Sequence, residues 1–293
     1  MTSLTLHAGD LRLALRPGLG GAIAGLWHGG RPVLRSTEPE ALEGVRLGGG
    51  FALLPYSNRL AQGRFTWAGR AHQLRLNFPG RPHPLHGCGW QRAWQVLERG
   101  PAHAVLGLHH LPDEDWPFAF DARQTLRLRP DGLSWHLALS NRDASPMPAG
   151  LGWHPYFPRT AGTALHARVD HRWRHDDTGL PLQREPWGGF DGEVAPLEGL
   201  DHGFEGWDGA ARIDQPGLSV ELRADQDRLV VFVPPQGAFF CVEPVSHRTD
   251  AIHADDPAAH GLVDLAPGET LDGTLHLRVT PATLPADTRP MDA

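Results

Sequence analysis

The chain of 293 residues contains no lysine, and all 27 of its basic residues are arginines. This absence excludes Schiff-base chemistry on a lysine amine, a phosphate-binding lysine of the Walker type and a lysine general base. Proton transfer in a catalytic site would have to use His, Asp, Glu, Tyr or Cys. A GC-rich genome produces the same arginine bias, so the bias by itself indicates no ligand.

Cysteine is also scarce, with only Cys88 and Cys241. Two thiols are too few for a disulfide framework, and we expect both to be reduced, although a redox pair would form if they approached each other. No run of about 18 apolar residues is present, so no membrane span is expected. The first residues do not read as a secretory signal. These features together predict a cytoplasmic protein.

A net charge of -7 gives no basic surface for nucleic acid. The 35 glycines and 27 prolines interrupt the chain too often for long helices. Short alternating runs predict strands instead, in hairpins such as 4–15 and 124–137. Further strands are expected near 95–97, 105–108, 218–222, 229–233 and 271–277. The fold class is therefore all-β, a large antiparallel β-sandwich or barrel.

No linker or internal repeat divides the chain. We predict one β-sandwich domain over residues 1–280 and a Pro-rich tail over 281–293. A monomer or a homodimer is expected.

One eight-residue segment, from Gly150 to Phe157, concentrates glycine, proline and aromatic residues around His154. Pro155 favours an extended backbone at His154, which would hold the imidazole in a defined position. Trp153, beside it, offers a flat face of the kind on which the C–H face of a pyranose stacks. A lone histidine in a chain with 18 of them is more often an ordinary loop residue, so the other motifs decide its meaning.

Two further polar motifs come earlier in the chain. Asn58 and Arg59 offer an amide and a planar fork of donors, which suit a diol or a carboxylate. His86 lies in a glycine-flanked segment with Cys88, and His83 is close by. These three residues could be metal ligands, but no matching Cys/His pair follows at ligand spacing, so we expect no metal site.

Two carboxylates complete the set. Asp201 stands near a glycine turn, where it could accept hydrogen bonds from sugar hydroxyls. Glu243 ends an apolar run that reads as a buried strand, and burial would raise its pKa towards that of a useful base. This inventory fits a neutral polyhydroxylated ligand held by hydrogen bonds and stacking.

The order of these motifs resembles that of the aldose 1-epimerase (galactose mutarotase) family. The resemblance rests on the motifs Asn58-Arg59, Leu85-His86-Gly87, residues 150–157 and Val242-Glu243-Pro244, and on a hairpin at 63–70. It implies the antiparallel supersandwich of that family, a monosaccharide substrate and no cofactor. It also implies that Glu243 is the catalytic base and His154 the acid, and that Arg59, His86 and Asp201 hold the sugar.

The main hypothesis is therefore a mutarotase that interconverts the α and β anomers of a free aldohexose. Two alternatives stay open: a hexose-6-phosphate mutarotase, for which several arginines should meet at one edge of the pocket, and a non-catalytic sugar-binding module of the same fold. The second has less support, because binding alone does not need an acid–base pair.

Overall fold

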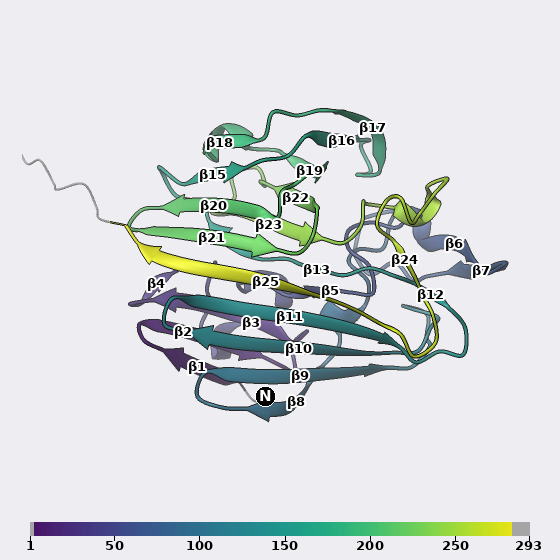
Figure 1. The fold of residues 1–293 in the computed structure, drawn as a ribbon, viewed down its shortest axis with the longest axis horizontal. Coiled ribbons are helices and arrows are strands. Elements are labelled where there is room, and N and C mark those ends of the chain that lie inside the picture. The colour runs from purple at the N-terminus through teal and green to yellow at the C-terminus, as the bar shows by residue number, and fades with distance from the viewer. Residues whose placement is uncertain (1–2, 283–293) are drawn as a thin grey trace, which may run out of the picture.

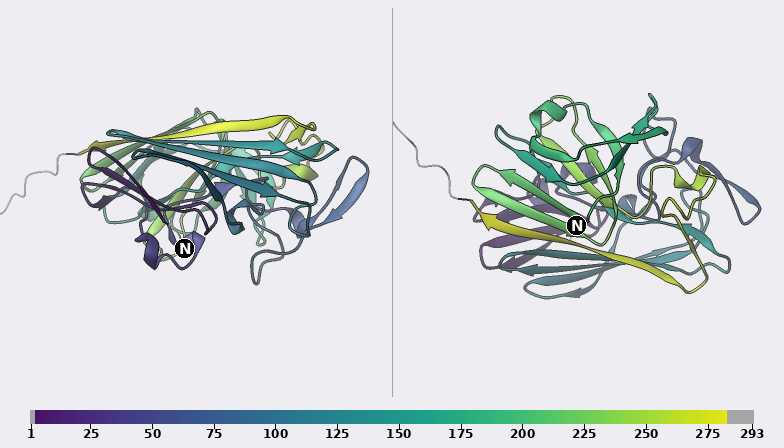
Figure 2. Two further views of the ribbon diagram at one scale, coloured as in Figure 1. Left: turned by 90° about the horizontal axis from the view of Figure 1, so that it is seen from below. Right: turned by 45° about the horizontal axis from the view of Figure 1, so that its top comes forward.

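The computed structural model describes residues 3–282, and most of them lie in antiparallel β-strands (Figure 1). Two large sheets form separate layers, seen from two further directions in Figure 2. The predicted all-β antiparallel sandwich is confirmed. The last strand includes Pro281, the first residue of the predicted tail, and residues 283–293 of that tail lie outside the described residues.

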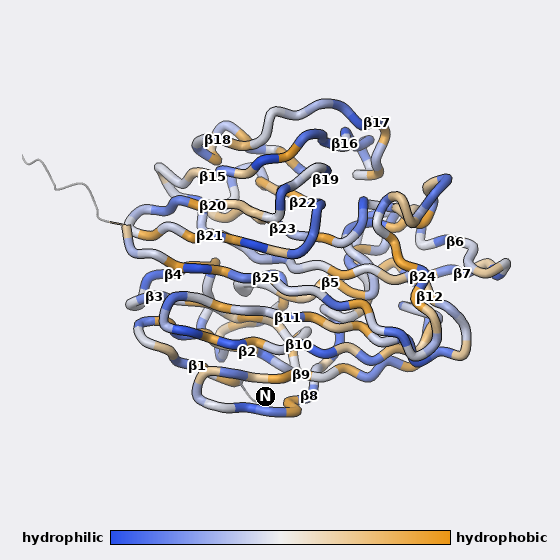
Figure 3. Tube along the Cα trace, in the orientation of Figure 1, coloured by the Kyte–Doolittle hydropathy of each residue, from blue (hydrophilic) through white to orange (hydrophobic). Residues whose placement is uncertain are grey.

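The larger sheet has nine strands, and its faces differ in polarity. Along the strand Phe120–Arg129, buried and more exposed residues alternate, as a half-buried strand requires. Figure 3 shows hydrophobic and hydrophilic residues along the chain. The order across the sheet is β18 (Phe190–Glu193), β15 (Ala164–Ala167), β20 (Ala210–Gln215), β21 (Leu218–Ala224), β25 (Thr270–Pro281), β11 (Gly132–Asn141), β10 (Phe120–Arg129), β9 (His103–His110) and β8 (Gln95–Arg99).

The second sheet has eight strands and carries the site described below. Seven of them follow the order β17 (Pro181–Pro186), β16 (His171–His175), β19 (Asp201–Glu205), β22 (Arg228–Phe232), β23 (Phe239–Val245), β13 (Gly152–Trp153) and β5 (Ala52–Leu53). The eighth, β14 (Tyr156–Pro158), also pairs with β23.

Smaller sheets and short helices fill the remaining chain. They are the sheet of β1 (Leu4–Ala8), β2 (Leu11–Arg16), β3 (Ala22–His28) and β4 (Arg31–Pro32), and the pairs β6 (Arg64–Trp67) with β7 (Arg70–Gln73) and β12 (Met147–Ala149) with β24 (Val263–Leu265). The helices are 3-10 turns: η1 (Pro39–Ala41), η2 (Val45–Leu47), η3 (Ala61–Gly63), η4 (Gly89–Gln91), η5 (Ala195–Leu197) and η6 (Ala251–His253). Within residues 3–282, no helix has the length and apolar character needed to cross a bilayer.

The predicted hairpins are confirmed. β1 pairs with β2, β6 with β7, and β10 with β11, each across a short turn. All the further predicted strands are also present, as β8, β9, β21, β22 and β25.

A single large hydrophobic core lies between the two main sheets. It includes Leu126 and Leu137 from the nine-stranded sheet and Val231, Phe240 and Val242 from the eight-stranded sheet. Because neighbouring residues of a strand point to opposite faces, the other face of β22 and β23 is free to form a cavity.

Candidate active site

A cavity of about 200 Å³ lies on the face of β22 and β23 that points away from the main core. This volume is below the ~300–1,000 Å³ of most small-molecule sites, which favours a ligand no larger than a monosaccharide. Its lining contains six of the seven residues that the sequence singled out, namely Asn58, Arg59, His86, His154, Asp201 and Glu243.

Glu243 reaches the cavity because of strand alternation along β23. Its neighbour Val242 packs in the main core, whereas Glu243 and Phe239 line the cavity. The carboxylate is buried, and its Oε2 atom has no hydrogen-bond partner among the described residues. Burial raises the pKa of Glu243 well above its usual value, and the negative charge of Asp201 adds to this rise.

His154 lies in the short connection between β13 and β14, where its ring packs against two aromatic rings. The ring centroids are 4.7 Å from Phe51 and 4.5 Å from Tyr156. The Nε2 atom of His154 is 3.3 Å from Oε1 of Glu243. Burial lowers the pKa of His154 to about 3, and the positive charge of Arg35 contributes to the shift.

His86 is held in one tautomer by the backbone of Asn58. The backbone N–H of Asn58 donates to Nδ1 of the His86 ring (3.0 Å), and the backbone N–H of His86 donates to the Asn58 carbonyl (2.8 Å). Because Nδ1 accepts a hydrogen bond, the neutral ring carries its proton on Nε2. His86 therefore offers a hydrogen-bond donor, and burial lowers its pKa well below the usual value.

Arg59 is fixed at the cavity wall by two neighbours. Its Nη2 atom donates to Oδ2 of Asp201 (2.9 Å), and its Nη1 atom donates to Oδ1 of Asn58 (3.0 Å). Asp201 begins β19, so this ion pair joins the loop after β5 to the opposite side of the eight-stranded sheet. The two side chains form one polar wall of the cavity.

The expected role of Trp153 needs correction. Its side chain is fully buried in the main core and does not line the cavity. The reason is the extended backbone, in which Trp153 and His154 point to opposite faces. The apolar part of the lining comes instead from Phe78, Tyr156 and Phe232, together with Phe239 and Val230.

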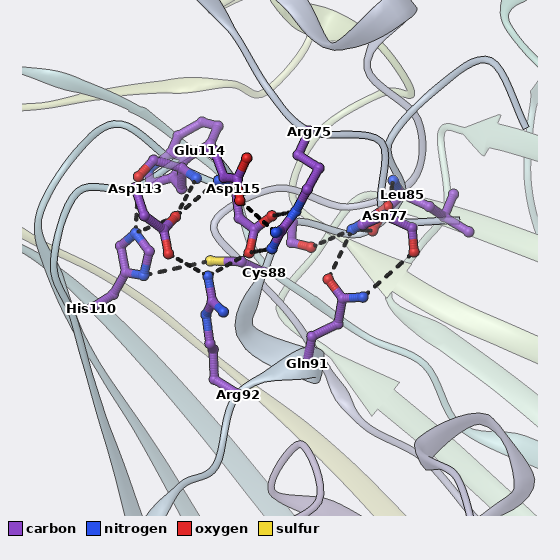
Figure 4. A network of polar contacts seen from close by, with 12 residues as sticks. Arg75, Asn77, Leu85, Cys88, Gln91, Arg92, His110, Asp113, Glu114 and Asp115 are labelled. Atoms are coloured by element: carbon purple, nitrogen blue, oxygen red, sulfur yellow. Dashed lines mark hydrogen bonds and ion pairs between the residues drawn. The ribbon is translucent and has the colours of Figure 1, made fainter. Parts of the chain in front are cut away.

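The loop around His86 is supported from behind by a polar network (Figure 4). The side chain of Asn77 accepts from the Leu85 N–H (2.7 Å) and donates to the Leu85 carbonyl (2.9 Å) and the Gly87 carbonyl (3.0 Å). The buried carboxylate of Asp115 binds Arg75 through two hydrogen bonds of 2.8 and 2.7 Å. The same carboxylate accepts a 2.5 Å hydrogen bond from Arg92, which follows η4.

His83, His86 and Cys88, which the sequence offered as possible metal ligands although no metal site was expected, do not converge on one point. His83 bonds the Gln62 N–H and the Thr178 hydroxyl, and Cys88 Sγ contacts His110. A different trio, His86, His154 and Glu243, places one possible ligand atom each within 4.8 Å of the others. A metal ligand needs an unprotonated nitrogen, but the tautomer of His86 directs an N–H to the cavity, so this trio fits a hydroxyl group better than a metal ion.

The two thiols are free and buried, and neither lines the cavity. Burial raises the pKa of Cys88 to about 12 and that of Cys241 well above its usual value, so both stay protonated thiols of low reactivity.

Some lining residues had no sequence signal. Arg46 comes from the short helix η2 and Thr178 from the turn between β16 and β17, both outside every motif, and only the folded chain brings them to the cavity. Phe239 could have been found, because it stands four residues before Glu243 and shares its strand face.

Comparison with known proteins agrees with this fold. The model of the aldose 1-epimerase family matches residues 2–278. An uncharacterized protein of Escherichia coli K12, YphB, is 33% identical over 304 aligned positions, which cover 95% of this chain and 99% of that protein.

Solved structures give the same result. A crystal structure described as a putative aldose 1-epimerase from Escherichia coli K12 superposes with a TM-score of 0.88 at 30% identity, covering 96% of this chain and 99% of the other. A galactose mutarotase-like protein from Clostridium acetobutylicum shares the fold, with a TM-score of 0.85 at 17% identity and coverage of 96% and 95%. The chain belongs to the aldose 1-epimerase family.

Proposed function

We propose that this protein is an aldose 1-epimerase that interconverts the α and β anomers of a free aldohexose such as galactose or glucose. The observation that carries the proposal is the contact of 3.3 Å between His154 Nε2 and Glu243 Oε1 in a cavity lined by hydrogen-bonding groups. A cytoplasmic location and a monomeric or homodimeric state stay predictions.

The reaction needs one proton removed from the anomeric hydroxyl and one delivered to the ring oxygen. The Glu243 carboxylate takes the O1 proton and the His154 imidazolium protonates O5, so the C1–O5 bond breaks and an aldehyde forms. Rotation about C1–C2 turns the other face of the aldehyde towards O5. Reclosure reverses both proton transfers, so neither a free alkoxide nor an oxonium ion forms.

The proton count of the pair stays constant through this cycle. A carboxylate with an imidazolium holds one proton, and so does a carboxylic acid with a neutral imidazole. The raised pKa of Glu243 and the lowered pKa of His154 favour the second arrangement in the empty cavity. Transfer of a single proton between the two side chains, which are in direct contact, produces the first.

The remaining polar residues hold the sugar. Arg59, the Nε2–H of His86 and the side-chain NH2 of Asn58 donate to hydroxyl oxygens, while Asp201 accepts from hydroxyl hydrogens. The aromatic wall formed by Phe78, Tyr156, Phe232 and Phe239 provides the apolar surface for the C–H face of the pyranose.

The proposal is tested by NMR or polarimetry of freshly dissolved α-glucose and α-galactose. We expect the wild-type protein to accelerate anomer exchange and Glu243→Gln to lose about 10²–10⁴-fold in rate, because the amide cannot accept the proton. Glu193→Gln, on the exposed residue Glu193 of β18, is the matched control and should keep full activity. Full activity of Glu243→Gln would remove Glu243 from the role of base, and tight sugar binding without exchange by the wild type would indicate a binding module.

A second candidate substrate is a hexose with an anionic group, such as a hexose 6-phosphate. Arg46 and Arg81 line the cavity, and neither forms an ion pair with a carboxylate of the described chain. The guanidinium of Arg46 lies 4.3 Å from the ring centre of Phe78 and is otherwise open to a ligand. Two unpaired guanidinium groups in a chain of net charge -7 favour an anion at this end of the cavity.

The two candidates are separated by comparing glucose with glucose 6-phosphate. If the sugar phosphate is the substrate, replacing both Arg46 and Arg81 with glutamine should raise KM for glucose 6-phosphate at least 10-fold. The KM for glucose should stay unchanged. If the wild type and the double arginine variant act on glucose and glucose 6-phosphate at equal rates, the free hexose stays the proposed substrate.

A further inference from the structure

His247 is a buried histidine that contacts several of the segments carrying the proposed active-site residues. It follows β23, two residues after Val245, and is 2% exposed. It does not line the main cavity, so it touches no substrate there. Together with Arg59, it lines a void of only about 10 Å³ on the other side of the loop after β5.

Both ring nitrogens of His247 have defined roles. The Ser57 N–H donates to Nε2 (2.9 Å), and the Ser57 hydroxyl lies 3.4 Å from the same atom. Nδ1 lies 2.8 Å from the carbonyl of Arg248. Since Nε2 accepts from a backbone N–H, the proton of the neutral ring is on Nδ1, which donates to that carbonyl.

The ring also fixes the entry to the His154 segment. A Cβ atom on Gly150 would lie 2.0 Å from Cδ2 of His247, so only glycine leaves room for the imidazole there. Beside this contact, Ser246 and Leu151 exchange two hydrogen bonds of 2.9 and 3.0 Å. The Gly150 N–H in turn donates to the carbonyl of Pro55 (2.7 Å).

We propose that His247 is a positioning residue that holds the Asn58–Arg59 segment in register with Glu243 and His154. The inference rests on the proposed epimerase function. The chain of contacts is short: the Ser57 amide bonded to His247 directly precedes Asn58, whose own amide fixes the tautomer of His86. Loss of the His247 contact would therefore shift Arg59 and release His86.

The state of His247 agrees with this role. Burial lowers the pKa of His247 to about 4, so the ring is neutral at physiological pH and Nε2 stays an acceptor. Arg228 and Asp250 also face the ring, and their opposite charges act in opposite directions on this pKa.

The test compares three replacements of His247 in an anomer-exchange assay. In His247→Gln the amide oxygen can take the place of Nε2 and accept from Ser57, whereas His247→Asn reaches only the position of Nδ1 and His247→Leu keeps bulk without polarity. We expect KM to rise at least 10-fold in the Asn and Leu variants with kcat within about 3-fold, and KM of the Gln variant to stay near that of wild type.

A purely structural role would give a different pattern. It would reduce the fraction of folded protein, and thus the apparent kcat, without changing KM. Leu222→Ala, a core truncation in β21 of the nine-stranded sheet, serves as the control for lost stability and should lower Tm at constant KM. If Leu fails to fold, the contrast between Gln and Asn decides.

Hydrogen exchange gives a readout that does not depend on the epimerase function. We expect faster exchange of the Ser57 and Asn58 amides in His247→Asn than in His247→Gln. Unchanged KM in both folded variants, or equal exchange at these amides, overturns the positioning role. A wild-type protein that does not accelerate anomer exchange would refute the proposed function instead, while the exchange result would still decide whether His247 holds the segment.

Discussion

At the scale of single residues, the decisive feature is that the two proposed catalytic side chains are buried in contact with each other. Glu243 is 2% exposed and His154 is 6% exposed. The charged form of each side chain is therefore destabilised, because it is poorly hydrated. Burial therefore moves both pKa values towards the uncharged forms, downward for His154 and upward for Glu243. The two groups together therefore hold a single proton over a wider pH range than the same two groups would in water.

This burial predicts the pH dependence of activity. A second proton binds the pair only near the lowered pKa of His154, about 3, instead of near 6.5. The single proton leaves only above the raised pKa of Glu243. We therefore expect kcat/KM, measured by polarimetry, to show no acid limb between pH 7 and 5. An acid limb centred near pH 6.5 would show that His154 titrates like an exposed imidazole.

The sequence predicted which residues form the site better than it predicted their orientation. The motif around His154 and the strand before Glu243 identified both side chains, but their distance depends on pairing between β13 and β23, which has no local signal. The prediction that Trp153 contacts the sugar does not fit the structure, because its side chain is buried in the main core. In an extended strand Trp153 and His154 cannot both face one cavity, but the sequence does not show which of the two does.

At the scale of elements, the turn between β16 and β17 forms one wall of the cavity. Its Thr178 hydroxyl accepts from Nε2 of His83 (2.9 Å) and donates to Asp176 (2.7 Å). Next to it, Gly179 has a φ of 88° and lies against the guanidinium of Arg59. The hairpins were predictable because their turns are local, whereas this wall joins segments almost a hundred residues apart and was not.

Gly179→Ala should weaken substrate binding for this reason. The new Cβ would lie 2.4 Å from Cζ of Arg59 and displace it, and the left-handed backbone costs about 1–2 kcal/mol of stability. Gly162→Ala is the matched control, since its φ is 77° and no atom lies within 4 Å of its new Cβ. Thermal unfolding should show similar losses in both, and kinetics a higher KM only in Gly179→Ala. Equal KM values would separate Gly179 from the position of Arg59.

At the scale of the whole molecule, several buried histidines act on stability in the same direction. Burial lowers the pKa of His154 to about 3, that of His247 to about 4 and that of His86 well below its usual value. Below the ordinary pKa of 6.5 the unfolded chain binds protons that the folded chain does not, so stability falls as pH falls. Glu243 acts oppositely, because its raised pKa lets the folded state hold a proton above pH 4.5.

The three histidines outnumber the single carboxylate, so acid should destabilise the protein. Each fully buried histidine lowers the free energy of unfolding by up to about 2–3 kcal/mol as the pH falls from 7 to 4.5. We expect Tm to fall over this range in thermal unfolding, and His247→Gln to show a smaller fall because one titrating group is gone. A Tm that rises towards pH 4.5 would mean that these rings are charged in the folded state.

The measurement that tests the central claim most directly is a double-mutant cycle on anomer exchange with Glu243→Gln and His154→Gln. If the two groups act as one acid–base unit, removing either group alone already abolishes the contribution of both. The double variant should therefore be no slower than the slower single variant. Losses that multiply in the double variant, or full exchange by either single variant, would contradict the paired mechanism.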